Sequence, residues 1–102
     1  MSTLLATPIL RLRTGPHAGK VYDVRSALRL GRHPYNEVSV PDPAVSRYHC
    51  WITFEEGIAL GEDLASANGT YLNGERVTKR LKLKEGDSIR LGSTVFLFSE
   101  AA

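Results

Sequence analysis

Cysteine is nearly absent from this 102-residue sequence, which contains only Cys50. A single cysteine excludes a disulfide within the chain and is typical of a protein from a reducing compartment. Long apolar runs are also missing, since residues 1–8 offer only Leu4, Leu5 and Ala6 in succession, too few for a signal peptide or a membrane span. We therefore expect a cytoplasmic protein that does not insert into a membrane.

A strong net charge is lacking as well. Thirteen basic residues against 11 acidic ones leave a formal charge of only +2, which is far from the basic surface of a nucleic-acid-binding protein. We expect no nucleic-acid partner. The length allows one domain with one hydrophobic core.

Helical periodicity is scarce, and the chain instead shows short segments with an apolar residue at every second position, bounded by Gly, Pro, Asn or Asp. These segments are 9–13, 20–24, 50–54, 58–60, 70–72, 81–84, 88–91 and 94–98. Segment 94–98 is apolar enough to face the core on both sides. About ten short strands with frequent turn signals predict an all-β fold, an antiparallel β-sandwich.

The predicted core takes one or two apolar residues from most strands. Its members are Leu12, Val21, Leu30, Val38, Val40, Trp51, Ile52, Leu60, Tyr71, Leu83, Ile89, Val95 and Leu97. We also expect Cys50 to be a buried small apolar residue, as free cysteines usually are. With a single core, the function must lie in loops at one edge of the sandwich.

Polar residues collect in three stretches between the predicted strands. Arg32 follows Gly31 at the end of a strand, and a second group precedes the strand at Cys50. The members of the second and third groups are Ser46, Arg47 and His49, then Ser66, Asn68 and Thr70 around Gly69. Together they offer a guanidinium group, hydroxyls, an amide and backbone N–H groups, a set of donors that suits a phosphate.

The same stretches carry a recognisable pattern. The letters GR at 31–32, SRYH at 46–49 and DLASANGTYLNG at 63–74, in this order and spacing, resemble the forkhead-associated (FHA) domain. The resemblance implies a β-sandwich of about eleven short strands with binding loops at one end, which bind phosphothreonine in a partner protein. We expect the FHA domain to span 9–98 between tails at 1–8 and 99–102, and such domains are commonly tethered to others in longer proteins.

The resemblance also implies a role for individual residues. The residues implied to bind the phosphate are Arg32, Ser46 and Arg47. Those implied to bind the peptide are Asn68 and Ser66. Those implied to set the shape of the loops are Gly31, His49, Gly69 and Thr70. Of the two Asn-Gly pairs that flank residues 70–72, the first would shape the binding loop, and the second, at 73–74, would be an ordinary hairpin turn.

Two positions depart from the pattern. Ala67 stands where relatives often carry threonine or another polar side chain, and Ala44 stands where some relatives use a charged residue to read the third residue after the phosphothreonine. Ala67 motivates an alternative hypothesis, a phospho-independent assembly or oligomerisation module that uses an exposed sheet face. Lys79 and Arg80, in a predicted loop, would favour acidic residues near the phosphosite.

Catalysis and cofactors are not expected. Ser46, His49 and Asp63 include the residue types of a hydrolase triad, but nothing in the sequence resembles a nucleophile elbow or an oxyanion loop. His17 and His33 lie in stretches separate from His49, without the spacing of zinc ligands. We therefore predict a binding module that is not an enzyme and holds no metal or other cofactor.

Overall fold

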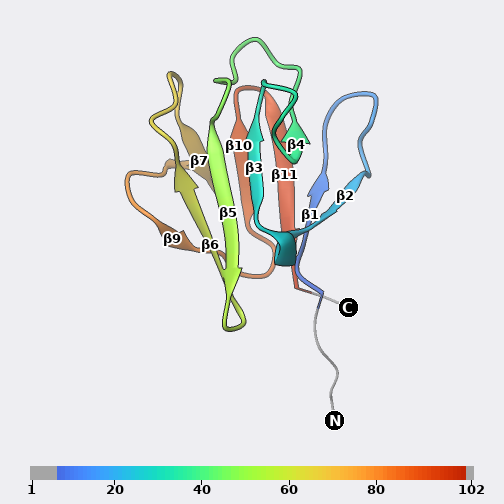
Figure 1. Cartoon of the computed structure of the whole chain (residues 1–102), viewed down its shortest axis with the longest axis vertical. Helices are drawn as coiled ribbons and strands as arrows, with labels where there is room; N and C mark the ends of the chain where they lie inside the picture. The colour runs from blue at the N-terminus through green and yellow to red at the C-terminus, as the bar shows by residue number, and fades with distance from the viewer. Residues whose placement is uncertain (1–6, 101–102) are drawn as a thin grey trace.

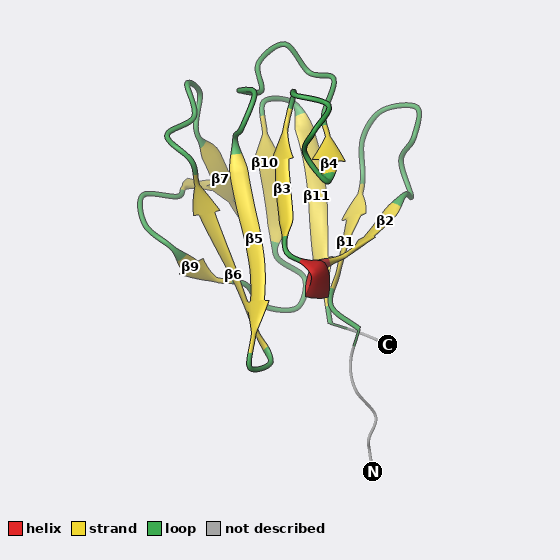
Figure 2. Cartoon of the chain, in the orientation of Figure 1, coloured by secondary structure: helices red, strands yellow, loops and turns green. Residues whose placement is uncertain are grey.

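The computed structural model describes residues 7–100, which form a sandwich of two sheets (Figures 1 and 2). Its elements are β1 (Ile9–Leu12), β2 (Val21–Asp23), the 3₁₀ helix η1 (Val24–Ser26), β3 (Leu28–Gly31), β4 (Val38–Ser39), β5 (Cys50–Glu55), β6 (Ile58–Asp63), β7 (Thr70–Leu72), β8 (Glu75–Arg76), β9 (Leu81–Lys82), β10 (Ser88–Leu91) and β11 (Thr94–Ser99). The six-stranded sheet has the order β2-β1-β11-β10-β7-β8, and the five-stranded sheet has the order β4-β3-β5-β6-β9.

The predicted all-β sandwich of about eleven strands is confirmed, with one difference in strand direction. Every paired strand is antiparallel to its neighbour except β4, which runs parallel to β3 with Leu30 opposite Val38. This pairing places β4 at the edge of its sheet, between the two loops that flank it in sequence.

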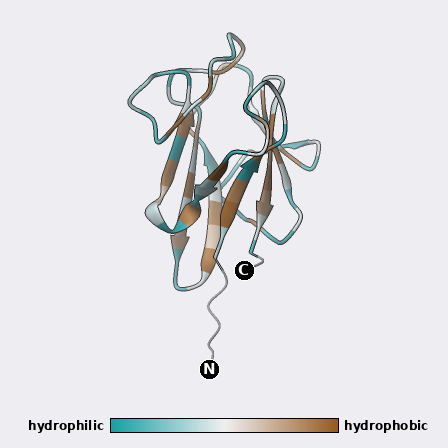
Figure 3. Ribbon diagram, turned by 90° about the vertical axis from the view of Figure 1, so that its right-hand side faces the viewer, coloured by the Kyte–Doolittle hydropathy of each residue, from teal (hydrophilic) through white to brown (hydrophobic). Residues whose placement is uncertain are grey.

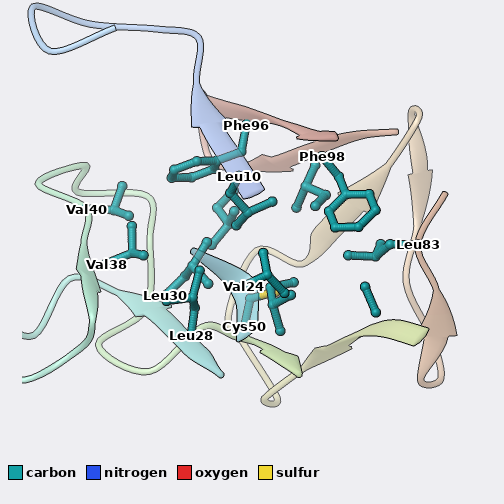
Figure 4. Close-up of a cluster of buried hydrophobic side chains, with 14 of the residues drawn as sticks. Leu10, Val24, Leu28, Leu30, Val38, Val40, Cys50, Leu83, Phe96 and Phe98 are labelled. Atoms are coloured by element: carbon teal, nitrogen blue, oxygen red, sulfur yellow. The ribbon is translucent and has the colours of Figure 1, made fainter. Parts of the chain in front are cut away.

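The core lies between the sheets and draws on both of them (Figure 4). Six predicted core residues are buried, namely Leu30, Val38, Val40, Ile52, Leu83 and Ile89, and Leu12 packs against them. Cys50 is also buried, as expected, and burial raises the pKa of its thiol to about 12. The thiol therefore stays protonated at neutral pH and acts as a small apolar group.

Other predicted core residues face outward. In β11 the buried residues are Phe96 and Phe98, whereas Val95 and Leu97 are only partly buried, so the prediction that both faces of this strand enter the core was wrong. The pairing with β1 determines which residues of β11 face the core, because the buried Leu10 lies opposite Phe98 on the same face of the sheet.

The other core residues that were predicted wrongly have a similar cause. The alternation of apolar and polar residues was assigned to the wrong face of the strand, or the strand was too short to show it. Val21 is 44% exposed and Trp51 is 40% exposed. In β2 the neighbouring Tyr22 packs against the core, and in β5 the buried residues are Cys50 and Ile52, on either side of Trp51. Leu60 and Tyr71 are partly buried. Each strand here has one face toward solvent, so only every second residue can enter the core.

The ends of the described chain lie at the opposite end of the sandwich from the loops that follow β3, β4 and β6 (Figure 1). Most of the expected tails, residues 1–6 and 101–102, fall outside the described residues. Two tail residues that the structure describes belong to the folded domain. Pro8 is buried and its carbonyl accepts a hydrogen bond from the Val24 N–H (2.9 Å), and Ser99 is the last residue of β11. Among residues 7–100 no helix is long and apolar enough to cross a membrane.

Candidate functional site

Three loops meet at one end of the sandwich, and all nine residues that the sequence singled out lie in them or at their edges (Figure 1). We call residues 32–37 the first loop, 40–49 the second loop and 64–69 the third loop. Figure 3 shows hydrophobic residues along the strands and hydrophilic ones mainly in loops and turns. The strands therefore carry mainly polar loops at this end of the sandwich.

Backbone hydrogen bonds join the first loop to the second. The Arg32 N–H donates to the Ser46 carbonyl (3.0 Å), and the His33 N–H donates to the Arg47 carbonyl (3.2 Å). Gly31 permits this approach, because a Cβ atom at this position would overlap the Arg47 carbonyl and the side-chain amide of Asn36. Any side chain at residue 31 would push the two loops apart.

The guanidinium of Arg32 is exposed but held in place. Its Nε donates to the Val45 carbonyl (3.0 Å), and within residues 7–100 its terminal nitrogens have no protein acceptor. Arg47 is exposed as well, and its backbone N–H has no acceptor in this part of the chain. These unoccupied donors lie on adjacent loops.

His49 ties the second loop to the third. Its ring is fully buried, its Nδ1 accepts the Ser46 N–H (3.0 Å), and its Nε2 lies 2.9 Å from the Gly69 carbonyl. Because Nδ1 accepts, a neutral ring carries its proton on Nε2 and donates it to Gly69. The imidazole is thereby fixed between two loops that are 20 residues apart in sequence.

Two further bonds close the gap between the same loops. The Ala67 N–H donates to the Ser46 hydroxyl (2.9 Å), which leaves the hydroxyl proton available for another acceptor. The Asn68 amide donates to the Ala44 carbonyl (2.9 Å) while its side chain stays exposed. The positions of Ala44 and Ala67 thus contribute through their backbones.

Asp63, the last residue of β6, holds the third loop through hydrogen bonds to its carboxylate. Its carboxylate accepts from the Ser66 hydroxyl (2.6 Å), the Ser66 N–H (3.0 Å) and the Thr70 hydroxyl (2.7 Å). Burial alone would raise the pKa of Asp63, but these hydrogen bonds, with a smaller contribution from nearby His49, lower it below the ordinary value of 3.8. Asp63 is therefore ionised at neutral pH and serves as an acceptor for the loop.

Ser66 differs from its sequence prediction. It is buried, its hydroxyl donates to Asp63, and the same hydroxyl oxygen accepts the Gly69 N–H (2.9 Å). Its only hydroxyl proton is thus used inside the loop. Ser66 belongs by geometry with the residues that shape the loop, together with Thr70, rather than with those that face a peptide.

The sequence reading missed two residues at this end. Asn36 is buried, and its amide donates to the carbonyls of His33 (2.8 Å) and Arg47 (2.7 Å). The guanidinium of Arg76 lies against Gly69, where a Cβ atom would come within 2.9 Å of Arg76 Nε. Asn36 had a weak signal, an amide at the end of a polar loop, and Arg76 had none, because it reaches the site only through the β7–β8 hairpin.

The chemistry of the site is that of a binding surface for an anion. Two exposed arginines lie on two loops held together by hydrogen bonds, with a hydroxyl proton and a backbone N–H that have no acceptor among the described residues. Within residues 7–100 no cluster of three or more metal-binding side chains occurs. Charged and neutral donors grouped in this way can hold a phosphate group.

Comparison with known proteins points to one family. The FHA domain profile matches residues 28–92. The chain is 35% identical over 97 residues to the oxoglutarate dehydrogenase inhibitor of Corynebacterium efficiens, an alignment that covers 92% of this chain and 68% of that protein. The next curated relatives are covered over 56–64% of their length, so the chain spans little more than half of most of them.

Solved structures agree. A domain from a structural study of phosphothreonine-dependent FHA interactions superimposes with a TM-score of 0.85 at 32% identity, covering 94% of this chain and 98% of that one. EmbR of Mycobacterium tuberculosis, solved with a low-affinity phosphopeptide, gives a TM-score of 0.85 at 30% identity, covering 95% of this chain and 25% of that one.

Proposed function

The chain belongs to the forkhead-associated (FHA) domain family, and from this we propose that it is a non-catalytic module that binds phosphothreonine in a partner protein. The observation that carries the proposal is the convergence of Arg32, Ser46 and Arg47 on two hydrogen-bonded loops, each with a donor that no protein group occupies within the described residues. Two solved relatives support it, one from a study of phosphothreonine-dependent interactions and one in complex with a phosphopeptide.

The phosphate would lie between the first and second loops. Arg32 offers its terminal nitrogens, Ser46 its hydroxyl proton and Arg47 its backbone N–H. Hydrogen bonds to a charged group contribute about 1.5–3 kcal/mol each, more than neutral ones, and donors already held in place lose little entropy on binding. Arg32 gains most from this, since its Nε is fixed on Val45.

The peptide main chain would be held by Asn68. Its Nδ2 uses one proton on Ala44, which leaves a second N–H and the amide oxygen for an extended ligand. We assign Gly31, His49, Gly69 and Thr70, now with Ser66, to maintaining the loops.

Residues around the phosphothreonine would meet basic side chains. A hollow of about 610 Å³ beside the third loop is lined in part by Arg76, Lys79 and Arg80, with Glu62 among its acidic members. We expect a preference for acidic residues in the ligand from this hollow, although Arg80 is shared with Glu55 at 3.9 Å.

The direct test is capture of a degenerate phosphothreonine peptide library, with the unphosphorylated library alongside. Capture should require the phosphate, and Arg32→Ala should weaken binding by roughly tenfold to a hundredfold without loss of fold. Arg29→Ala is the matched control, because Arg29 lies in β3, three residues before Arg32, is exposed, and pairs with Glu37 on the surface (3.5 Å). Equal binding by Arg32→Ala and the parent would refute the site.

A second candidate function is supported by one observation. The outer face of the five-stranded sheet exposes Trp51 (40%) and Ile58 (39%), which would suit phospho-independent assembly. Phosphatase treatment of the partner separates the two, since it abolishes the first kind of complex and spares the second. In either case we propose a cytoplasmic location, because the lone buried Cys50 fits a reducing compartment.

A further inference from the structure

Three aromatic rings form a cluster beside the phosphate-binding loops. His33 stacks on Tyr48, with ring centroids 5.3 Å apart and an angle of 24° between the planes, and meets Tyr35 edge-on at 5.0 Å and 66°. Two of these residues directly follow proposed phosphate ligands, since His33 follows Arg32 and Tyr48 follows Arg47. We call these three residues the aromatic cluster.

The rings of the aromatic cluster pack against one another, but both tyrosines remain exposed to solvent. Tyr35 is 82% exposed and Tyr48 is 44% exposed, whereas the other two tyrosines have packing partners: Tyr22 packs edge-on against Phe96, and Tyr71 lies under Arg90. Leaving a large ring in water forfeits the free energy that its burial would supply. The two tyrosines that remain exposed are both in the candidate binding loops.

The cluster is also held in one arrangement. The His33 N–H donates to Arg47, its Nδ1 accepts the Tyr35 N–H (3.1 Å), and its carbonyl accepts from Asn36. His33 is therefore held without a ligand, and both tyrosine rings pack against it, so binding has less to order. An exposed aromatic surface built around a held ring is suited to contact with a ligand side chain.

We propose that Tyr35, Tyr48 and His33 form a subsite that selects an aromatic residue of the peptide, close in sequence to the phosphothreonine. This rests on the proposed function. Neighbouring Cα atoms are about 3.8 Å apart, and an extended peptide advances about 3.3–3.6 Å per residue, so the cluster lies within reach of about three residues on either side of the phosphothreonine.

Charge argues for an aromatic side chain rather than a cationic one. A lysine or arginine of the ligand could also stack on these rings, but it would approach Arg32 and Arg47, which the phosphate must already neutralise. A neutral ring meets no such repulsion and can pair edge-to-face or offset with the tyrosines. An aliphatic residue would gain only burial.

The test uses phosphothreonine peptides in an alanine background, each with one phenylalanine placed at one of the three positions before or after the phosphothreonine. Affinity, measured by calorimetry, should rise about threefold to tenfold at one position over the all-alanine parent. Leucine at that position should give a smaller gain. Tyr35→Ala and Tyr48→Ala should each abolish most of the gain while still binding the parent peptide, and Tyr35→Phe should retain it.

Trp51→Ala is the matched control, since it removes an exposed aromatic side chain from the outer sheet face, and it should leave the gain intact. A gain that survives both tyrosine variants, or no gain at any position while the parent peptide still binds through its phosphate, would overturn the subsite and leave the proposed function standing. Failure of the parent peptide to bind at all would overturn both.

Discussion

The two Asn-Gly pairs, Asn68-Gly69 and Asn73-Gly74, have the same two residues in very different regions. Asn73 and Gly74 both have positive φ (50° and 87°) and close the two-residue turn between β7 and β8, where Leu72 pairs with the next strand. In the first pair only Gly69 has a positive φ (89°). One pair is a hairpin turn, as predicted, and the other is part of an irregular loop.

The two Asn-Gly pairs also differ in their hydrogen-bond partners. Asn73 bonds to the Asp87 carboxylate and to the Ser88 N–H (both 2.9 Å), at the start of β10, the strand that pairs with β7. Asn68 and Gly69 instead reach the second loop, through the Ala44 carbonyl and the ring of His49. The first pair therefore shapes a surface, whereas the second stabilises the fold, and each can be altered separately.

The largest effect is expected from Asn73→Ala. The change removes two side-chain hydrogen bonds, leaves Asp87 without its amide donor, and places alanine in a left-handed conformation. The free energy of unfolding should fall by about 2 kcal/mol, measured by urea denaturation. Phosphopeptide affinity should stay within about twofold of the parent, and a loss of affinity with unchanged stability would reverse the assignment of the two pairs.

Alanine substitutions of Gly69 and Gly74 provide a second comparison between the two pairs. Gly74→Ala should cost about 1 kcal/mol of stability from its positive φ alone, because a Cβ atom there meets no other atom within 4 Å. Gly69→Ala carries the same backbone strain and also displaces the guanidinium of Arg76. It should lose about 1–2 kcal/mol of stability and, unlike Gly74→Ala, several-fold in affinity. Equal affinities of the two variants for the phosphopeptide would mean that Gly69 does not contribute to the binding site.

Acidification should affect the two regions in different pH ranges. The second pKa of a phosphate is about 6, so affinity should fall by up to about tenfold between pH 7 and pH 5. The pKa of Asp42 is lowered by the Ala44 N–H and by donors from Ser93 and Thr94, and the pKa of Asp63 is lowered as described.

A lowered folded-state pKa gives stability that is present above the ordinary value of 3.8 and is lost as the pH falls through the folded value. The melting temperature should therefore show no loss from these two groups between pH 7 and pH 5. A melting temperature that fell together with affinity over this range would mean that the fold, and not the ligand, is titrating.

Asn68→Ala should give the smallest effect of the series. It removes one exposed side-chain bond within the protein and the proposed bonds to the peptide main chain. Affinity should fall about fivefold, and the free energy of unfolding should change by less than about 0.5 kcal/mol, the pattern opposite to that of Asn73→Ala. Unchanged affinity would remove Asn68 from the peptide site.

The architecture was predictable where local signals agree. Alternation in 88–91 and the Asn-Gly turn at 73–74 identified strands and a hairpin correctly. Segment 94–98 is apolar at almost every position, so periodicity alone could not show that Phe96 and Phe98, rather than Val95 and Leu97, face the core. That choice depends on pairing with β1, more than 80 residues away in sequence.

The site was predictable to the extent that its residues lie in short motifs. Arg32, Ser46 and Asn68 could be proposed as site residues because they belong to such motifs, and the fold places all three on the loops at one end of the sandwich. Asn36 and Arg76 were missed because their contacts, with the Arg47 carbonyl and with Gly69, exist only after the loops and the β7–β8 hairpin have come together. Ser66 was grouped with the peptide-binding residues because a hydroxyl in a motif does not reveal that Asp63 accepts its proton in the folded chain.

The central claim is that phosphothreonine binds on the loop end of the sandwich, and amide chemical-shift mapping tests it most directly. A phosphothreonine peptide titrated into the labelled domain should shift the amides of Arg47, Asn68 and their neighbours in the three loops, and leave those of Asn73 and Gly74 in place. The unphosphorylated peptide should shift none of them. Shifts centred on Trp51 and the outer face of the five-stranded sheet, or shifts that do not require the phosphate, would contradict the account.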